Sequence, residues 1–292
     1  MAQINIHIYD DLVRIFRQEI EDVGYPTTDI TDPYKLIIMY FTMRKRLVEK
    51  RPRKVILPQG FICPSALQNG LDVLVKKFEN GEDVNPHLSR TTKELGFPDL
   101  MLFDWNIHHF HLGTTLEADG YMSRTGDILY AIVSKDAVHF IKIQPHNHWS
   151  DLDLIETIHQ NWPELIATFK IDGTPEVAFN STEITQLRKA HVNVMITTQD
   201  GTGYLGMGMG FMTDGSSSDA AMQAVRKAHE AKNIEKRLIE ELNSIESDLG
   251  RNDMKFDVEA VRMPNGIYAI EHNYNLWGIL YNFKSIKDQY GL

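Results

Sequence analysis

Three β-rich segments joined by short links occupy the middle of this 292-residue chain and most constrain its fold. They cover residues 106–112, 127–133 and 137–143. The link between the last two, 134–136, is long enough only for a tight turn between antiparallel neighbours. The sequence therefore predicts an antiparallel meander, in which the residues of each strand alternate between two faces of the sheet.

Helical periodicity flanks this meander on both sides. We expect helices over residues 10–23, 33–50, 64–78 and 151–161. Ser150 and Asp153 have the S-x-x-D spacing of a capping box and predict the start of the last helix. Residues 54–58 are typical of a short strand or an extended connector, and 84–98 favour neither helix nor strand.

The C-terminal part predicts a separate β-β-α-β-β unit. Its expected elements are strands over 191–198 and 202–213, a helix over 219–242, and a hairpin of 254–262 and 267–272. Pro264-Asn-Gly266 is a strong turn signal for that hairpin. The glycines between Gly201 and Gly210 alternate with larger residues and lack the strand–turn–helix context of a nucleotide loop. Their bare face would let the 219–242 helix approach the sheet closely.

These elements predict an α+β protein in three parts. A helical segment over 1–63 would lead into a region with an antiparallel sheet over 64–170, followed by the C-terminal domain over 183–292. The linker between the last two would be 171–182, around Asp172-Gly-Thr-Pro175.

Composition narrows the class of protein. The single cysteine, Cys63, excludes an intramolecular disulfide framework and a zinc site with several cysteines. No apolar run is long enough to cross a bilayer, and the first residues lack a secretory signal, so we expect a cytoplasmic protein. A net charge of −10 argues against coating nucleic acid by bulk electrostatics.

One basic run stands out against this acidic background. It is either the solvated end of a helix or a surface that contacts phosphates. On the second interpretation, the RNA-binding residues would be Arg44, Lys45, Arg46, Arg51, Arg53 and Lys54, together with Lys142.

Five histidines gather at the ends of the predicted strands. His108, His109 and His111 lie in the first strand, and His146 and His148 follow the third. Period two places His109 and His111 on one face, opposite His108, Phe110 and Leu112. Arg124 precedes the second strand, and the start of the 151–161 helix would present its positive dipole end to a phosphate nearby.

Three interpretations of this histidine cluster remain open. The histidines can be structural, satisfying buried backbone groups, and the chain can then be a protein-binding module. His109-x-His111 with Glu117 resembles the first metal motif of cupins, although the second motif, P-x-G-x-x-H, is missing. Imidazole would suit iron, manganese or zinc there.

The third interpretation is cleavage of RNA without a metal or other cofactor. This reaction needs a base for the 2′-OH, an acid for the leaving 5′-oxygen and a cation for the phosphorane charge. We expect His109 or His111 as the base, His146 as the acid and Arg124 as the cation. Tyr130 and His148 would orient them.

The order of elements over residues 64–165 resembles the core of RelE/ParE-like toxins. The resemblance is carried by His108-His-Phe-His-Leu-Gly113, by Arg124-Thr-Gly-Asp-Ile-Leu-Tyr-Ala-Ile-Val133 and by 137–146, which ends at His146. It implies a RelE-like sheet and a metal-independent endoribonuclease that acts as a toxin or a phage-defence effector. RNA would be the substrate and an antitoxin a partner. The C-terminal domain has no counterpart in that family and would serve for homo-oligomerisation, inhibition or target binding.

Overall fold

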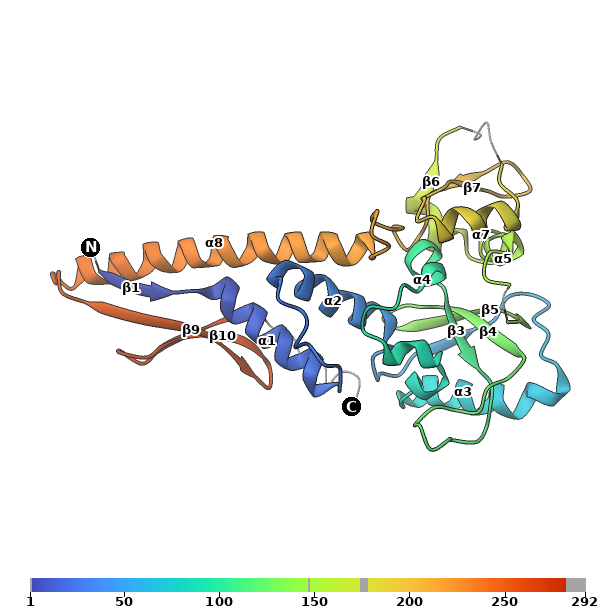
Figure 1. Cartoon of the computed structure of the whole chain (residues 1–292), viewed down its shortest axis with the longest axis horizontal. Helices are drawn as coiled ribbons and strands as arrows, with labels where there is room; N and C mark the ends of the chain where they lie inside the picture. The colour runs from blue at the N-terminus through green and yellow to red at the C-terminus, as the bar shows by residue number, and fades with distance from the viewer. Residues whose placement is uncertain (1, 147, 174–177, 282–292) are drawn as a thin grey trace. The chain divides into compact units, whose positions relative to one another are not determined.

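The computed structural model describes residues 2–146, 148–173 and 178–281 and shows an α+β protein (Figure 1). Its contacts divide the chain into two compact units. Unit 1 comprises residues 1–43 and 220–292, and unit 2 comprises 44–219. None of the described helices is long and apolar enough to span a membrane.

Unit 1 is built on a four-stranded sheet with the order β1-β9-β10-β11. These strands are β1 (Gln3–Ile6), β9 (Lys255–Met263), β10 (Gly266–Glu271) and β11 (Leu276–Tyr281). The hairpin expected across Pro264-Asn-Gly266 is confirmed, with Met263 opposite Gly266. Neither β1 nor β11 is evident from the sequence. β1 lies parallel to β9, so residues from the two ends of the chain share one sheet.

Helix α1 (Ile8–Asp22) packs on β9. Its apolar stripe buries Leu12, Phe16 and Ile20, and the Phe16 ring stacks on Tyr40 of α2 at 4.1 Å between centroids. The helix α2 (Pro33–Arg46) ends four residues before its predicted end. The chain leaves the helix there because the backbone N–H and C=O of Val48 both bond to the Asn85 side chain. The long helix α8 (Ser218–Asp248) extends beyond its expected end.

Unit 2 contains the predicted meander. β3 (His108–His111), β4 (Asp127–Val133) and β5 (Ala137–Pro145) are antiparallel neighbours, which confirms that prediction. β2 (Lys54–Ile56) adds a parallel edge strand beside β5. The complete order is β2-β5-β4-β3.

Helices cover both faces of this sheet (Figure 1). α3 (Gln68–Asn80) packs on the face that carries Phe110 and Phe140. The other face, with Ile128 and Ile141, packs against α5 (Leu152–Asn161) and α4 (Leu100–Trp105). α4 is not evident from the sequence. The face that carries His109 is therefore covered over much of its area and is not open to solvent as a whole.

Short elements complete unit 2. They are the 3-10 helices η1 (Ser65–Leu67), η2 (Asn85–His87), η3 (Arg90–Lys93) and η4 (Ala167–Phe169), the helices α6 (Pro163–Ile166) and α7 (Ser181–Lys189), and the strands β6 (Lys170–Ile171), β7 (Ile196–Thr197) and β8 (Gly203–Tyr204). β6, β8 and β7 form a small sheet in that order. Residues 174–177 of the predicted linker lie outside the described residues.

The glycine-rich segment differs from the expected long hairpin. Only β7 and β8 form strands, and both belong to unit 2. A Cβ added at Gly206 or Gly208 would collide with the end of α4, at Asp104 and at the Phe103 carbonyl respectively. The glycines do permit a close approach, but the partner is α4 rather than the 219–242 helix.

The two units also differ from the division into 1–63, 64–170 and 183–292. Residues 1–43 join the C-terminal sheet through β1, while 44–63 and 183–219 belong to unit 2. An ion pair of 2.9 Å between Lys45 Nζ and Asp219 Oδ2 joins the two ends of unit 2.

Candidate active site

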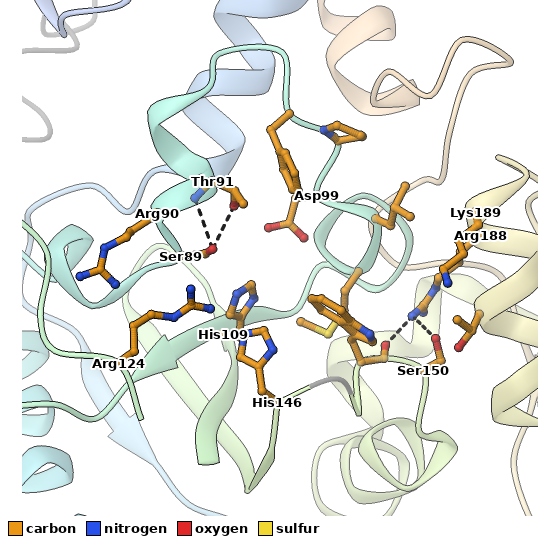
Figure 2. A pocket seen from close by; sticks show the side chains of 16 residues that line it. Ser89, Arg90, Thr91, Asp99, His109, Arg124, His146, Ser150, Arg188 and Lys189 are labelled. Carbon is orange, nitrogen blue, oxygen red and sulfur yellow. Dashed lines mark hydrogen bonds between the residues drawn. The ribbon is translucent and has the colours of Figure 1, made fainter. Parts of the chain in front are cut away.

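Unit 2 encloses a cavity of about 260 Å³ where several of its segments meet (Figure 2). β3 contributes His109, the connection to β4 contributes Arg124, and the end of β5 contributes His146. α7 supplies Arg188 and Lys189 from the opposite side. The remaining lining residues are Ser89, Arg90, Thr91, Phe97, Pro98, Asp99, Leu100, Met101, Trp149, Ser150 and Thr185.

Two of the predicted catalytic histidines meet in this cavity. The rings of His109 and His146 lie 6.0 Å apart between centroids, at an interplanar angle of 88°. Both touch Trp149, with ring centroids at 6.4 Å from His109 and 5.4 Å from His146. β4 pairs with both β3 and β5, and its register places Ile128 opposite His111 on one side and opposite Gln144, two residues before His146, on the other.

His111 lies behind His146 and does not line the cavity. Its ring stacks on His146 at 5.8 Å and 15°. Its Nδ1 accepts a hydrogen bond of 3.3 Å from the Thr125 backbone N–H, so the neutral ring carries its proton on Nε2. The carbonyl of His111 accepts a bond of 2.9 Å from His87 Nδ1. These contacts hold His111 in place as a support for His146.

Burial controls the charge of these rings. Loss of solvent lowers the pKa of His109, and the neighbouring His146 and Arg124 lower it further, against the opposing effect of Asp99. Burial likewise lowers the pKa of His111 to about 4, as it does for His87 and His108. At neutral pH His109 is therefore an uncharged imidazole, which is the form that accepts a proton.

The cations around the cavity fall into two groups. Arg90 pairs with Glu117 and, at 2.6 Å, with Asp119, and Arg188 Nε pairs with Asp104 at 2.7 Å. In contrast, neither Arg124 nor Lys189 forms an ion pair with the residues that the structure describes. Both are exposed, and Figure 2 shows the Arg124 guanidinium directed toward His109. These two side chains are available to an anion.

Asp99 places a carboxylate in the same space (Figure 2). It is the N-cap of α4, and its Oδ1 accepts a bond of 3.1 Å from the Leu102 N–H. Its Oδ2 makes no hydrogen bond to the described part of the chain. The cap fixes the direction of the side chain and leaves acceptor capacity facing the cavity.

The two orienting residues expected from the sequence lie elsewhere. Tyr130 is opposite His109 on β4 but is fully buried in the core, and this burial raises its pKa. His148 is half-exposed outside the cavity lining, with Nδ1 at 2.7 Å from an Asp151 oxygen. The expected capping box is also wrong, because Asp151 is the N-cap of α5 and the Ser150 hydroxyl accepts from Arg188 instead.

The cupin-like arrangement does not form. The carboxylate of Glu117 pairs with Arg90, and Glu117 is not among the cavity residues. Over the ranges that the structure describes, no three histidine, cysteine or carboxylate side chains are grouped closely enough to hold a metal ion.

The basic run does not form a continuous cationic surface. Arg46 is 3% exposed and donates to the carbonyls of Thr91 and Glu94, while Arg53 is 6% exposed and donates to those of Glu49 and Ser134. Lys45 is occupied by Asp219. Arg51 lies 3.8 Å from Glu49, and Lys142 pairs with Asp153. Arg44 is half-buried and Lys54 exposed. The prediction of an RNA-binding surface fails at Arg46 and Arg53, because their donors are used inside the fold.

Among the cavity residues that sequence reasoning missed, Asp99, Trp149, Arg188 and Lys189 bear on its chemistry. Asp99 had a usable signal, because it precedes the short apolar stretch that becomes α4, as an N-cap does. Trp149 directly follows His148 in the sequence. Arg188 is buried beside Asp104 and stacks on Trp105 at 3.8 Å, and the residues next to it in the sequence do not indicate this. Lys189 follows it in sequence and has no local signal.

No protein-family model, no curated protein and no solved structure matches this chain. The resemblance to RelE/ParE-like toxins thus stays a prediction from the sequence, and the site must be interpreted from its own chemistry.

Proposed function

We propose that this cavity cleaves RNA by metal-independent acid–base catalysis. The observation that carries the proposal is the meeting of His109 and His146, at 6.0 Å between ring centroids, in one cavity with the Arg124 guanidinium. Two imidazoles and a cation are the groups that transfer of an RNA phosphoryl group to its own 2′-oxygen requires.

The environments of the two rings favour one assignment of roles. His109 is buried and uncharged at neutral pH, which suits a base that removes the 2′-OH proton. The 2′-oxygen then forms a bond to phosphorus, and the bond to the 5′-oxygen breaks. His146 donates a proton to that leaving oxygen. The products are a 2′,3′-cyclic phosphate and a free 5′-OH, so atoms and charge balance without an oxidant or a metal.

Arg124 and His111 would have supporting roles. The Arg124 guanidinium would pair with the non-bridging oxygens as charge accumulates on phosphorus. His111 stacks on His146 and, because its pKa is lowered, stays neutral and does not repel a proton on His146. A positioning residue of this kind changes the rate through the orientation of its neighbour.

The test is RNA cleavage in EDTA by the full chain, with elemental analysis of the same preparation. We expect cleavage to persist in EDTA, the 5′ fragments to carry a 2′,3′-cyclic phosphate by mass spectrometry, and His109→Ala and His146→Ala each to abolish it. Cleavage that survives in both variants, or that stops when a stoichiometric metal is removed, would refute the proposal.

As a cellular role we propose a toxin or phage-defence effector, which follows from the chemistry because unrestrained RNA cleavage stops growth. Induced expression of the wild-type chain should arrest growth, and expression of His109→Ala at an equal protein level should not. Equal growth of the two strains would contradict this role even if cleavage occurs in vitro.

A further inference from the structure

Much of the cavity wall plays no part in proton transfer. Phe97, Pro98, Leu100, Met101 and Trp149 provide an apolar lining, and the Trp149 ring, 36% exposed, touches both catalytic histidines. The cavity volume of about 260 Å³ is near the lower end of the range for small-molecule pockets, about 300–1,000 Å³. Such a space admits one nucleotide of a strand rather than a folded helix.

One end of this lining carries a hydrogen-bond acceptor. Asp99 is anchored through Oδ1 to the Leu102 N–H, and Oδ2 is unused within the described residues. Because an oxygen of a carboxylate has two lone pairs, both oxygens can accept a further bond. Figure 2 shows the carboxylate directed into the cavity, toward the side that holds His109.

We propose that the cavity selects guanine. In this arrangement Asp99 accepts hydrogen bonds from the N1–H and N2–H groups of the base, and Trp149 stacks on its face. The inference rests on the proposed function, because it names the nucleotide that the cleavage site takes.

The pattern of donors distinguishes guanine from the other bases. A base that is unstacked from its strand exposes its Watson–Crick edge. Guanine presents two adjacent donors there, N1–H and N2–H, which match the two oxygens of a carboxylate. Adenine and cytosine each place an acceptor next to their amino donor, and uracil places its single N–H between two acceptors. Asp99 would repel those acceptors.

The charges set the direction of the nucleotide. The carboxylate of Asp99 disfavours a phosphate beside it, whereas the guanidinium of Arg124 favours one at its side of the cavity. Trp149 touches both His109 and His146, so a base stacked on it lies beside the reacting phosphate. The base read by Asp99 is therefore the one whose 2′-OH attacks, and cleavage follows guanosine.

The experiment measures binding and cleavage separately. Binding of 3′-GMP, 3′-AMP, 3′-CMP and 3′-UMP to the full chain is followed by calorimetry, because these compounds cannot be cleaved. Cleavage is mapped on an RNA that contains all four bases. We expect 3′-GMP to bind about 10- to 100-fold more tightly than the others, as two good hydrogen bonds allow, and cuts to fall after G.

Asp99→Asn is the decisive variant. Asparagine caps a helix as well as aspartate does, so α4 should persist, but its amide replaces one acceptor with a donor. The preference for 3′-GMP should fall about tenfold or more, with an unchanged melting temperature. Asp136→Asn, in the exposed β4–β5 turn, is the matched control and should keep the preference. Trp149→Ala should weaken binding of all four nucleotides.

The outcomes separate this inference from the proposed function. Cleavage that depends on His109 but falls equally after every base would overturn guanine selection and leave the function standing. Selective 3′-GMP binding that depends on Asp99, without any cleavage, would support the base site and refute the nuclease. Equal binding of all four nucleotides, or an Asp99→Asn variant that keeps the preference for 3′-GMP, would overturn the inference directly.

Discussion

The basic run at residues 44–54 and the wall of the cavity both concentrate charged side chains, but they use them in opposite ways. In the basic run, Arg46 and Arg53 are buried and their guanidinium groups donate hydrogen bonds to backbone carbonyls. On the cavity wall, Arg124 is exposed and no described residue pairs with it. The comparison shows that positive charge in a sequence indicates a ligand only where donors remain unused.

The largest expected effect is on the rate of RNA cleavage and comes from His109, the proposed general base. His109→Ala should lower the rate of RNA cleavage by about 10²- to 10⁴-fold, the usual contribution of a general base. His229→Ala removes an exposed histidine on α8 and should change the rate by less than about twofold. Single-turnover kinetics measure both. Equal losses in the two variants would show that the cavity has no special role.

The largest loss of stability is expected from a substitution in the basic run. Arg46→Ala leaves several carbonyls without their donor in a buried place, so we expect a loss of about 3 kcal/mol in the free energy of unfolding. Arg51→Ala, which removes a partly exposed side chain 3.8 Å from Glu49, should cost less than about 0.5 kcal/mol. Urea titrations test the pair, and similar values would contradict the structural role of Arg46.

Lowering the pH should reduce the free energy of unfolding through His87, which donates to the His111 carbonyl. The pKa of His87 is lowered by burial to about 4, below the ordinary value of about 6.5 in the unfolded chain. Its contribution to stability is therefore complete above pH 6.5 and is lost as the pH falls toward 4, with about 2 kcal/mol already lost at pH 5.

His87→Asn tests this contribution, because its amide can replace Nδ1 as donor to the His111 carbonyl but does not titrate. The variant should lose about 2 kcal/mol less stability between pH 7 and pH 5 than the wild type does. Chemical denaturation at the two pH values measures the difference. Parallel pH profiles would mean that folding does not change the pKa of His87.

The smallest effect compares Arg124, which lines the cavity, with Arg51, which lies 3.8 Å from Glu49. Arg124→Ala should slow cleavage about tenfold, because an arginine that pairs with the transition-state charge is lost. Arg51→Ala should leave the rate within about twofold, since Arg51 lies outside the cavity lining. The same single-turnover assay measures both rates at two salt concentrations. A larger loss of rate in Arg51→Ala than in Arg124→Ala would contradict the comparison.

Local patterns predicted much of the fold. β4 has the bounds that its run of apolar residues indicates, and the β3–β4–β5 meander follows from short links. The pairing of β1 with β9 did not follow, because Asn5 and Asp257 meet although they are 252 positions apart. Sequence periodicity carries no information on contacts over such distances.

The residues of the candidate site likewise fall into those that local patterns predicted and those that depend on tertiary packing. His109 lies on β3, Arg124 in the connection from β3 to β4 and His146 directly after β5, so the meander was enough to bring them together. Asp99 and Arg188 enter from α4 and α7, two short helices whose position depends on tertiary packing. Tyr130 was misassigned because alternation fixes a face of the sheet but does not reveal that α5 and α4 cover it.

Unit 2 is inserted between the two sequence segments of unit 1, which determines the order in which the two units can fold during synthesis. Residues 44–219 form an unbroken stretch whose ends are joined by Lys45 and Asp219, so unit 2 needs no later residue to fold as it leaves the ribosome. β1 is made first but finds its partner only when β9 emerges. A nascent chain from which residue 219 has emerged would thus already contain every residue of the cavity, while β1 still lacked its partner β9.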